Sequence, residues 1–308
     1  MIEAIVLGAG AGGGFPQWNS NAPGCVRARA RDPAAAACTQ ASIAITADRL
    51  RWFILNASPD LRIQIERTPA LHPVGGLRST PIAGVILTGG EVDTITGLLC
   101  LREGQPFRLL ATAEVLSRLD QNPIFEVLSR ALVPRIALTP GHKLMLMAPQ
   151  DGRSGLWVTG FPVPGKVPLY AEAGSARPAD ALVDGETFGL EISDGVRRLV
   201  FVPGCAVMTP DLRLRLDGAD CVFFDATLWQ DDEMIQAGLG VKTGRRMGHM
   251  SISGAGGVFD SFRGLAIERK ILIHMNNSNP VLLSDSAERR SAHDHGWDVA
   301  HDGMVVSL

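Results

Sequence analysis

Short runs of apolar residues recur along this chain, and most of them end at a glycine or a polar residue. Runs of roughly four to eight such residues between turn-forming residues are typical of buried β-strands. The runs that predict strands are residues 2–7, 41–45, 52–55, 82–87, 107–111, 156–161, 199–202, 221–224 and 271–274. Apolar residues at helical spacing predict helices over residues 60–68, 96–102, 113–120, 124–131, 210–216 and 231–238.

Strands outnumber helices in this pattern, and the two do not alternate as strand–helix–strand units. Two sheets enclosed between helices satisfy such a pattern, so we expect an α/β (α+β) fold with four layers in the order αββα. Residues 163–184 are rich in proline, glycine and alanine, which favours a long loop over one face rather than a linker. The chain is therefore predicted to form a single domain over residues 1–308.

Composition and charge exclude several classes of partner. A net charge of −3 without a strongly basic run argues against nucleic acid as a ligand. No apolar run reaches the roughly 18 residues of a membrane helix, and the N-terminus lacks the pattern of a signal peptide. Five cysteines without C-x-x-C spacing fit reduced thiols. We therefore expect a cytoplasmic protein that does not insert into membranes.

A glycine run follows the first predicted strand. Gly8, Gly10 and Gly13 satisfy the dinucleotide-binding pattern G-x-G-x-x-G, which requires a helix to begin at its end. The sequence continues instead with Phe15 and Pro16, and Pro23 and Gly24 come soon after, which is typical of a loop. We favour a wide turn that brings the backbone close to a site or to another strand.

Polar residues at the ends of predicted strands are the candidates for chemistry, because a strand aims the side chain and the adjoining loop gives access. Asp93, Cys205, Asp225 and His274 follow four of these strands, and His249 follows a glycine farther along the chain. Each also has a structural interpretation: an aspartate can form a turn or cap a helix, a histidine can be satisfied in the core, and Cys205 and Cys221 can be small core residues. No role is assigned to the remaining histidines, which are His72, His142, His293, His295 and His301.

The segment that contains Asp93 has the form of a metal-binding loop without its histidines. It resembles the T-H-x-H-x-D-H-x-x-G motif of the metallo-β-lactamase superfamily, with Gly89, Glu91 and Thr94 at the histidine positions. The resemblance extends along the chain, since Cys205 stands where that superfamily has an aspartate and His274 where it has the closing histidine. It implies a metallo-β-lactamase-like sandwich without the usual two-zinc site.

In the same resemblance, Asp225 and His249 match a carboxylate and a histidine of the phosphodiesterase subgroup. Such a pair can serve as a proton-transfer dyad, so we expect both residues to be catalytic. A hydrolase of phosphodiesters or lactams is nevertheless the least favoured class, because the histidines that build a two-metal site are absent.

Several long motifs together resemble the PqqB family of coenzyme PQQ synthesis proteins, over essentially the whole chain. They are GAGGGFPQWN at residues 10–19, NASPD at 56–60, TGRRMGH at 243–249, HMNNSNP at 274–280 and HDGM at 301–304. The resemblance implies a cytoplasmic, iron-dependent oxygenase in the synthesis of pyrroloquinoline quinone (PQQ). Its substrate would be a cross-linked glutamate–tyrosine intermediate cut from the peptide PqqA, with O₂ as co-substrate. The alternative is a non-catalytic carrier of PQQ or its precursor to the periplasm.

The chain departs from this family pattern in two places. Many members have aspartate–histidine where Asp93 and Thr94 stand, and many have a cysteine-rich string, a structural zinc site, of which only Cys25 remains. We therefore expect that the structural zinc is missing.

For Fe(II), two histidines and one carboxylate suffice to form a facial site with open positions. We favour His249, His274 and Asp93 as the ligands. Asp225 is either a further ligand or a group that orients His249, and Glu91 could substitute. Cys205 is the least favoured ligand, because a thiolate would be oxidised in O₂ chemistry. The sequence leaves the oligomeric state open, with a homodimer as one candidate.

Overall fold

Two mixed β-sheets form the centre of the molecule in the computed structural model, which describes residues 1–149, 152–172 and 186–308. Each sheet has seven strands within these residues. The first sheet runs in the order β14 (Val305–Ser307), β1 (Glu3–Gly8), β2 (Ser42–Thr46), β3 (Trp52–Leu55), β4 (Ile82–Ile86), β5 (Arg108–Ala111) and β6 (Arg135–Ala137). The second runs in the order β13 (Trp297–Val299), β12 (Arg269–Ile273), β11 (Cys221–Asp225), β10 (Arg198–Val202), β9 (Phe188–Ser193), β8 (Arg153–Pro162) and β7 (Lys143–Met147).

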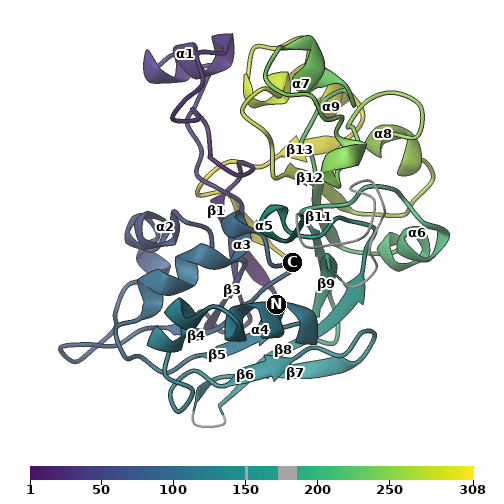
Figure 1. Ribbon diagram of the computed structural model, residues 1–308. Coiled ribbons are helices and arrows are strands. Elements are labelled where there is room, and N and C mark those ends of the chain that lie inside the picture. Colours follow the sequence, from purple (N-terminus) through teal and green to yellow (C-terminus); the bar gives the residue numbers. More distant parts are fainter. Residues whose placement is uncertain (150–151, 173–185) are drawn as a thin grey trace.

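Side-chain alternation along the strands of the first sheet separates two apolar cores. Phe53 and Leu55 pack in a core shared with the second sheet, whereas the intervening Ile54 packs in a separate core with helices α2 (Leu61–Arg67) and α4 (Ala113–Asp120). Helices α6 (Pro210–Leu216), α8 (Val258–Ser261) and α9 (Ala287–Asp294) contribute to the core of the second sheet. The two groups of helices lie on different sides of the molecule (Figure 1). The predicted αββα fold is thus confirmed.

Parallel pairing brings the carboxyl ends of the central strands together. β3, β4 and β5 are parallel neighbours in the first sheet, and β10, β11, β12 and β13 are parallel neighbours in the second. The chain leaves each of these strands at the same edge of its sheet, so polar residues distant in sequence meet there.

The glycine run joins the two sheets at this edge. Gly10 forms isolated bridges to Gln40 on one side and to Met275 on the other. The Asp302 carboxylate accepts hydrogen bonds from the backbone N–H groups of Ala9 and Thr39 and so links the glycine run to the segment before β2. The run is therefore a connection between strands, as expected from the loop-forming residues after it.

All nine predicted strands are present, but several elements went unpredicted. Five strands lack a continuous apolar run, because they are short or because polar residues alternate with apolar ones in them: β6, β7, β9, β13 and β14. Helix α9 is polar on most of its surface. Helix α1 (Pro23–Arg29) was interpreted as loop because of Pro23 and Gly24, yet proline is favourable in the first turn of a helix.

The structure also differs from prediction in segments outside the sheets. The helix expected over residues 96–102 is the 3₁₀ helix Thr96–Leu101, and that expected over 231–238 is reduced to α7 (Glu233–Gln236). The helix expected over residues 124–131 is only a 3₁₀ turn, Pro123–Val127. In the loop predicted over 163–184, residues 169–172 form the short helix α5 (Leu169–Glu172), and residues 173–184 lie outside the described part. The single-domain assignment stays a prediction.

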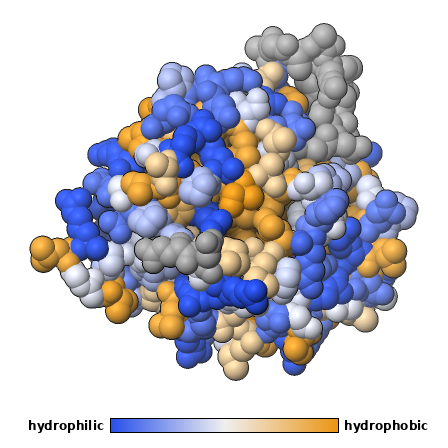
Figure 2. Space-filling view, turned by 90° about the horizontal axis from the view of Figure 1, so that it is seen from below, coloured by the Kyte–Doolittle hydropathy of each residue, from blue (hydrophilic) through white to orange (hydrophobic). Residues whose placement is uncertain are grey.

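Hydrophilic side chains predominate on the face shown in Figure 2, around a central band of hydrophobic ones. Within the described residues, no helix combines the length and the apolar character needed to cross a membrane.

Gly97 gives a test of the close packing that supports the loop after β4. It lies in the 3₁₀ helix Thr96–Leu101, and a Cβ there would stand 2.0 Å from the Ser58 carbonyl oxygen. Because that neighbour is backbone, Gly97→Ala is expected to lower the free energy of unfolding by about 2 kcal/mol or more. Gly240→Ala, at an exposed glycine whose added Cβ meets only the Met234 side chain, should change it by less than about 0.5 kcal/mol. Urea unfolding of both variants measures the difference, and equal stabilities would contradict the packing argument.

Candidate functional site

A cavity of about 590 Å³ opens where the carboxyl ends of the strands meet. Its wall comes from loops that are far apart in sequence: the glycine run, the loop after β4, and the segments after β10, β11 and β12. Asp93, His249 and His274 all line it, and so does Glu91. The sequence-based candidates are therefore brought together, with Asp225 directly behind the cavity wall.

The Asp225 carboxylate is fully buried at the end of β11 and is surrounded by hydrogen-bond donors. Its Oδ2 accepts from the Cys205 backbone N–H at 3.0 Å and lies 2.8 Å from His249 Nδ1. Its Oδ1 accepts from the Thr227 backbone N–H at 3.1 Å and from the Thr227 hydroxyl at 2.7 Å. With both oxygens engaged and no exposed surface, Asp225 is placed to orient His249.

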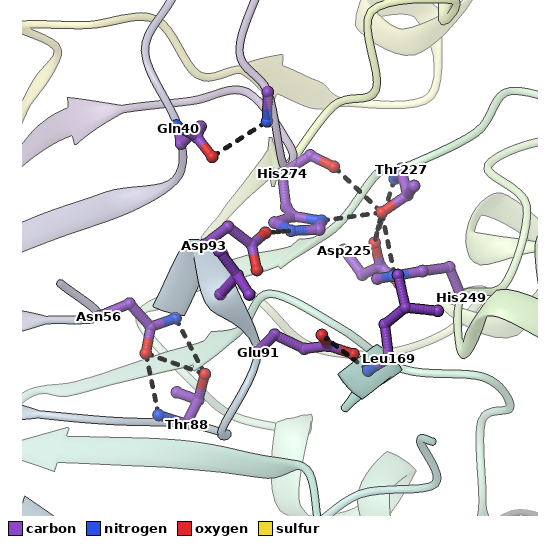
Figure 3. Close-up of polar contacts among 12 residues, drawn as sticks. Gln40, Asn56, Thr88, Glu91, Asp93, Leu169, Asp225, Thr227, His249 and His274 are labelled. Atoms are coloured by element: carbon purple, nitrogen blue, oxygen red, sulfur yellow. Dashed lines mark hydrogen bonds and ion pairs between the residues drawn. The ribbon is translucent and has the colours of Figure 1, made fainter. Parts of the chain in front are cut away.

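His274 joins the two sides of the site (Figure 3). It follows β12 with a left-handed backbone, φ +64°, and its side chain is only 14% exposed. Its Nδ1 lies 2.9 Å from the Thr227 hydroxyl oxygen, and its Nε2 lies 3.2 Å from Asp93 Oδ2. Asp93 is on the short helix α3 (Val92–Ile95), which begins in the loop that follows β4.

Asp93 and His274 shift each other's pKa in opposite directions. Burial disfavours the charged form of Asp93, but the hydrogen bond and attraction to His274 outweigh burial and lower the pKa of Asp93 below its usual value. Burial also disfavours the charged form of His274, and here Asp93 prevails and raises the pKa of His274. The two side chains therefore form an ion pair when His274 is protonated.

The side chains present fit a metal ion. One candidate ligand atom from each of Asp225, His249 and His274 lies within 4.8 Å of the others, and the two rings are stacked with centroids 5.2 Å apart. Two ligands of one ion are separated by roughly 3 Å, given bond lengths near 2.1 Å. The 3.2 Å between His274 Nε2 and Asp93 Oδ2 meets this requirement. Asp93 is not one of the three residues of that group; it lies at Nε2 of His274, whereas Asp225 and Thr227 contact the Nδ1 atoms. Asp93 is therefore the candidate carboxylate beside the two histidines in the cavity lining.

Two glycines keep space open beside these candidate ligands. A Cβ on Gly12 would stand 3.4 Å from Asp93 Oδ2, and a Cβ on Gly204 would stand 3.4 Å from His249 Cε1. Both glycines line the cavity. A Cβ at either position would be in ordinary van der Waals contact with the candidate ligand, so each glycine leaves the space of one methyl group free beside it.

Glu91 and Cys205 have other partners. Glu91 Oε1 lies 3.2 Å from Lys166 Nζ, and Glu91 Oε2 accepts from the Leu169 backbone N–H at 3.3 Å. Its role as a substitute ligand stays a prediction. Burial raises the pKa of the Cys205 thiol to about 12, so this residue remains a protonated core thiol, in line with its low ranking as a ligand.

The structure also places Cys25 and the histidines to which no role was assigned. Cys25 is buried in α1 beside Asn277, and among the described residues the one group of three possible ligands is Asp225, His249 and His274. The expected absence of a structural zinc stays a prediction. The histidines without an assigned role, namely His72, His142, His293, His295 and His301, are all exposed.

Sequence reasoning missed several polar residues of the site, among them Lys166 and Lys242, which line the cavity. Thr227 follows Asp225 by two positions and contacts both histidines. Asn56 and Thr88 form a buried hydrogen-bonded pair in the cavity wall, and Asn56 has φ +63°. The signal for Asn56 was its place directly after a strand, followed by Ser58 and Pro59; Thr227 had no comparable signal, since a threonine after a strand is common.

The chain is similar to known proteins along its whole length. Residues 51–275 match the family model described as the β-lactamase superfamily domain. The chain is 64% identical over 307 residues to coenzyme PQQ synthesis protein B of Gluconacetobacter diazotrophicus, with all of both chains covered. Among solved structures it resembles Zn²⁺-bound PqqB from Methylobacterium extorquens, at 44% identity and a TM-score of 0.93 over 99% of this chain and 100% of that one. A diphosphatase of the PhnP family, at 16% identity and a TM-score of 0.66 over 100% of this chain and 98% of that one, shares the fold.

The ion pair between Asp93 and His274 predicts a pH dependence of the metal-free protein. The folded-state pKa of His274 is raised, so its contribution to stability is full below the unfolded value of about 6.5 and is lost as pH rises through the folded value. The folded-state pKa of Asp93 is lowered. Its contribution to stability is therefore full above the unfolded-state pKa of about 3.9 and is lost as pH falls through the folded-state pKa. Asp93→Asn should therefore lower the pKa of His274 and destabilise the fold most between these limits. NMR titration of the histidine ring and melting curves measure both effects; an unchanged pKa of His274 would show that the pair does not form.

Proposed function

We propose a function from one premise: the chain belongs to the β-lactamase superfamily and, within it, to the family of coenzyme PQQ synthesis protein B. Membership of this family assigns the chain to PQQ biosynthesis. In that biosynthesis it acts in the cytoplasm as an Fe(II)- and O₂-dependent hydroxylase. Its substrate is the tyrosine ring of the cross-linked glutamate–tyrosine intermediate derived from PqqA.

The observation that carries this proposal is the convergence of His249, His274 and Asp93 on an open cavity. Two histidines and one carboxylate are the ligand set of non-haem iron oxygenases. These three side chains would hold Fe(II), which when bound supplies the redox chemistry that activates O₂. The relative from Methylobacterium extorquens was solved with zinc, and imidazole ligands suit both metals.

The residues that line the cavity would bind the substrate, and Asp225 would orient one of the candidate metal ligands. The cavity, at about 590 Å³, lies in the range that encloses a small organic ligand. Lys166 and Lys242 line it, Lys166 paired with Glu91 and both paired with Glu172, so a carboxylate of the glutamate–tyrosine compound would bind these ammonium groups in exchange for the glutamates. Asp225 holds the His249 ring in one orientation through the 2.8 Å contact at Nδ1.

A specific observation favours the second candidate, a carrier of PQQ or its precursor. Gly89 and Thr94 occupy two positions where the superfamily motif has histidines, and Glu91, at the third, is paired with Lys166. A chain with so reduced a motif could retain the cavity as a binding site without catalysis. Such a carrier would bind PQQ tightly in the absence of iron.

Oxygen consumption tests the hydroxylase. Protein purified anaerobically and reconstituted with Fe(II) should consume O₂ and add oxygen to the glutamate–tyrosine intermediate, as measured by an oxygen electrode and mass spectrometry. His274→Ala should lower both rates by more than roughly 100-fold, because losing a ligand costs at least as much as losing a group that orients one.

His142→Ala is the matched control, because His142 is exposed and does not line the cavity. It should retain the activity of the unmodified protein. Full activity in a folded His274→Ala variant would refute the proposed iron site. Tight binding of PQQ by iron-free protein that shows no turnover when loaded with iron would favour the carrier instead.

A further inference from the structure

The Thr227 hydroxyl lies at the centre of the site, within hydrogen-bond distance of two imidazole rings (Figure 3). Its oxygen is 3.0 Å from His249 Nδ1, 2.9 Å from His274 Nδ1 and 2.7 Å from Asp225 Oδ1. The His274 carbonyl oxygen is a fourth neighbour at 3.1 Å. Because a hydroxyl has one proton and two lone pairs, this arrangement restricts where the protons can be.

We propose that Thr227 is a positioning residue that selects the tautomer of His274 and, together with Asp225, that of His249, with the proton on Nδ1 and the lone pair on Nε2 in both rings. The inference rests on the proposed function only in taking these two histidines as metal ligands. It assigns to Thr227 the role of fixing which nitrogen of each ring faces the ion.

The contacts of Asp225 determine where the first protons are. Two of the groups that contact its carboxylate are backbone N–H groups, of Cys205 and Thr227, which can only donate. The carboxylate therefore accepts at both oxygens. The hydroxyl proton of Thr227 goes to Asp225 Oδ1, which at 2.7 Å is the nearest of its four neighbours. A proton directed at either ring or at the His274 carbonyl would leave a hydroxyl lone pair against this charged oxygen.

The lone pairs of the Thr227 oxygen then face the two rings. An unprotonated Nδ1 at 2.9–3.0 Å would place one lone pair against another, so both Nδ1 atoms must donate. For His249 the same proton is also directed at Asp225 Oδ2, 2.8 Å away. A neutral imidazole has one N–H, so Nε2 of each ring retains its lone pair for a metal ion.

His274 shows the consequence most directly. Its Nδ1 faces Thr227 and its Nε2 faces Asp93, so without a metal ion both nitrogens meet acceptors. A cation bound at Nε2 replaces a proton there and leaves the contact to Thr227 intact.

The test compares two substitutions that separate the hydroxyl from the methyl group of Thr227. Thr227→Val removes the hydroxyl at almost constant shape, and Thr227→Ser retains it. Affinity for Zn²⁺, measured by competition with a chelator, should fall by roughly 10- to 100-fold in Thr227→Val and stay within about threefold of the unmodified protein in Thr227→Ser. Equal affinity in Thr227→Val, or an equal loss in both variants, would overturn the proposal.

Imidazole nitrogen NMR shifts provide a readout that packing alone would not change. In the unmodified protein, His249 without metal and both rings with Zn²⁺ bound should carry the proton on Nδ1 at about pH 9, where free imidazole is neutral. A proton on Nε2 of either Zn²⁺-bound ring, or of His249 without metal, would refute the inference even if Thr227→Val fails to fold. Neither experiment uses O₂ or the organic substrate. A failure of the hydroxylase proposal can therefore be distinguished from a failure of the role proposed for Thr227.

Discussion

The buried carboxylate of Asp225 is the interaction on which the rest of the site depends. A charged group without exposed surface is stable in a protein only when donors surround it, and here the donors come from three separate segments. The Cys205 N–H belongs to the loop after β10, the Thr227 groups to the chain after β11, and the His249 ring to a loop farther along. Satisfying this one carboxylate therefore brings all three segments to the same place.

The second requirement is a firm junction between the two sheets, because the candidate ligands come from both. Asp93 follows a strand of the first sheet, and His274 follows one of the second. The glycine run supplies the junction through its bridges to Gln40 and Met275, and the Asp302 carboxylate holds it in place. The absence of a Cβ permits close approach in this run, since a Cβ on Gly8 would stand 2.2 Å from the Gln40 carbonyl oxygen and one on Gly10 would stand 3.2 Å from the Thr39 carbonyl oxygen. The geometry between Asp93 and His274 is thus set by the packing of the sheets.

The loop after β4 keeps the aspartate and the glycine of a superfamily motif but has none of its histidines. Asp93 and Gly97 retain the positions of the motif, and Gly97 packs its backbone against Ser58. Glu91 is turned toward Lys166 and the backbone of Leu169, where it ties the segment that contains α5 to the cavity rim. What remains of the motif suits a single ion held mainly by residues from the second sheet. A two-metal hydrolytic centre would need histidines that this loop does not have.

The sequence by itself determined the strands whose apolar runs are continuous, the layered fold, and the polar residues at the strand ends, because burial of whole runs leaves a pattern that is visible locally. Asp93, Asp225 and His274 could be found in this way. Only the tertiary structure decided what each residue contacts. Thr227 and His274 are 47 positions apart, and Lys166 and Glu91 are 75 apart, so their meeting depends on strand register and on loops that cross the sheet edge. The structure also placed Asp225 behind the cavity wall, since the number of donors around a buried carboxylate cannot be counted along a chain.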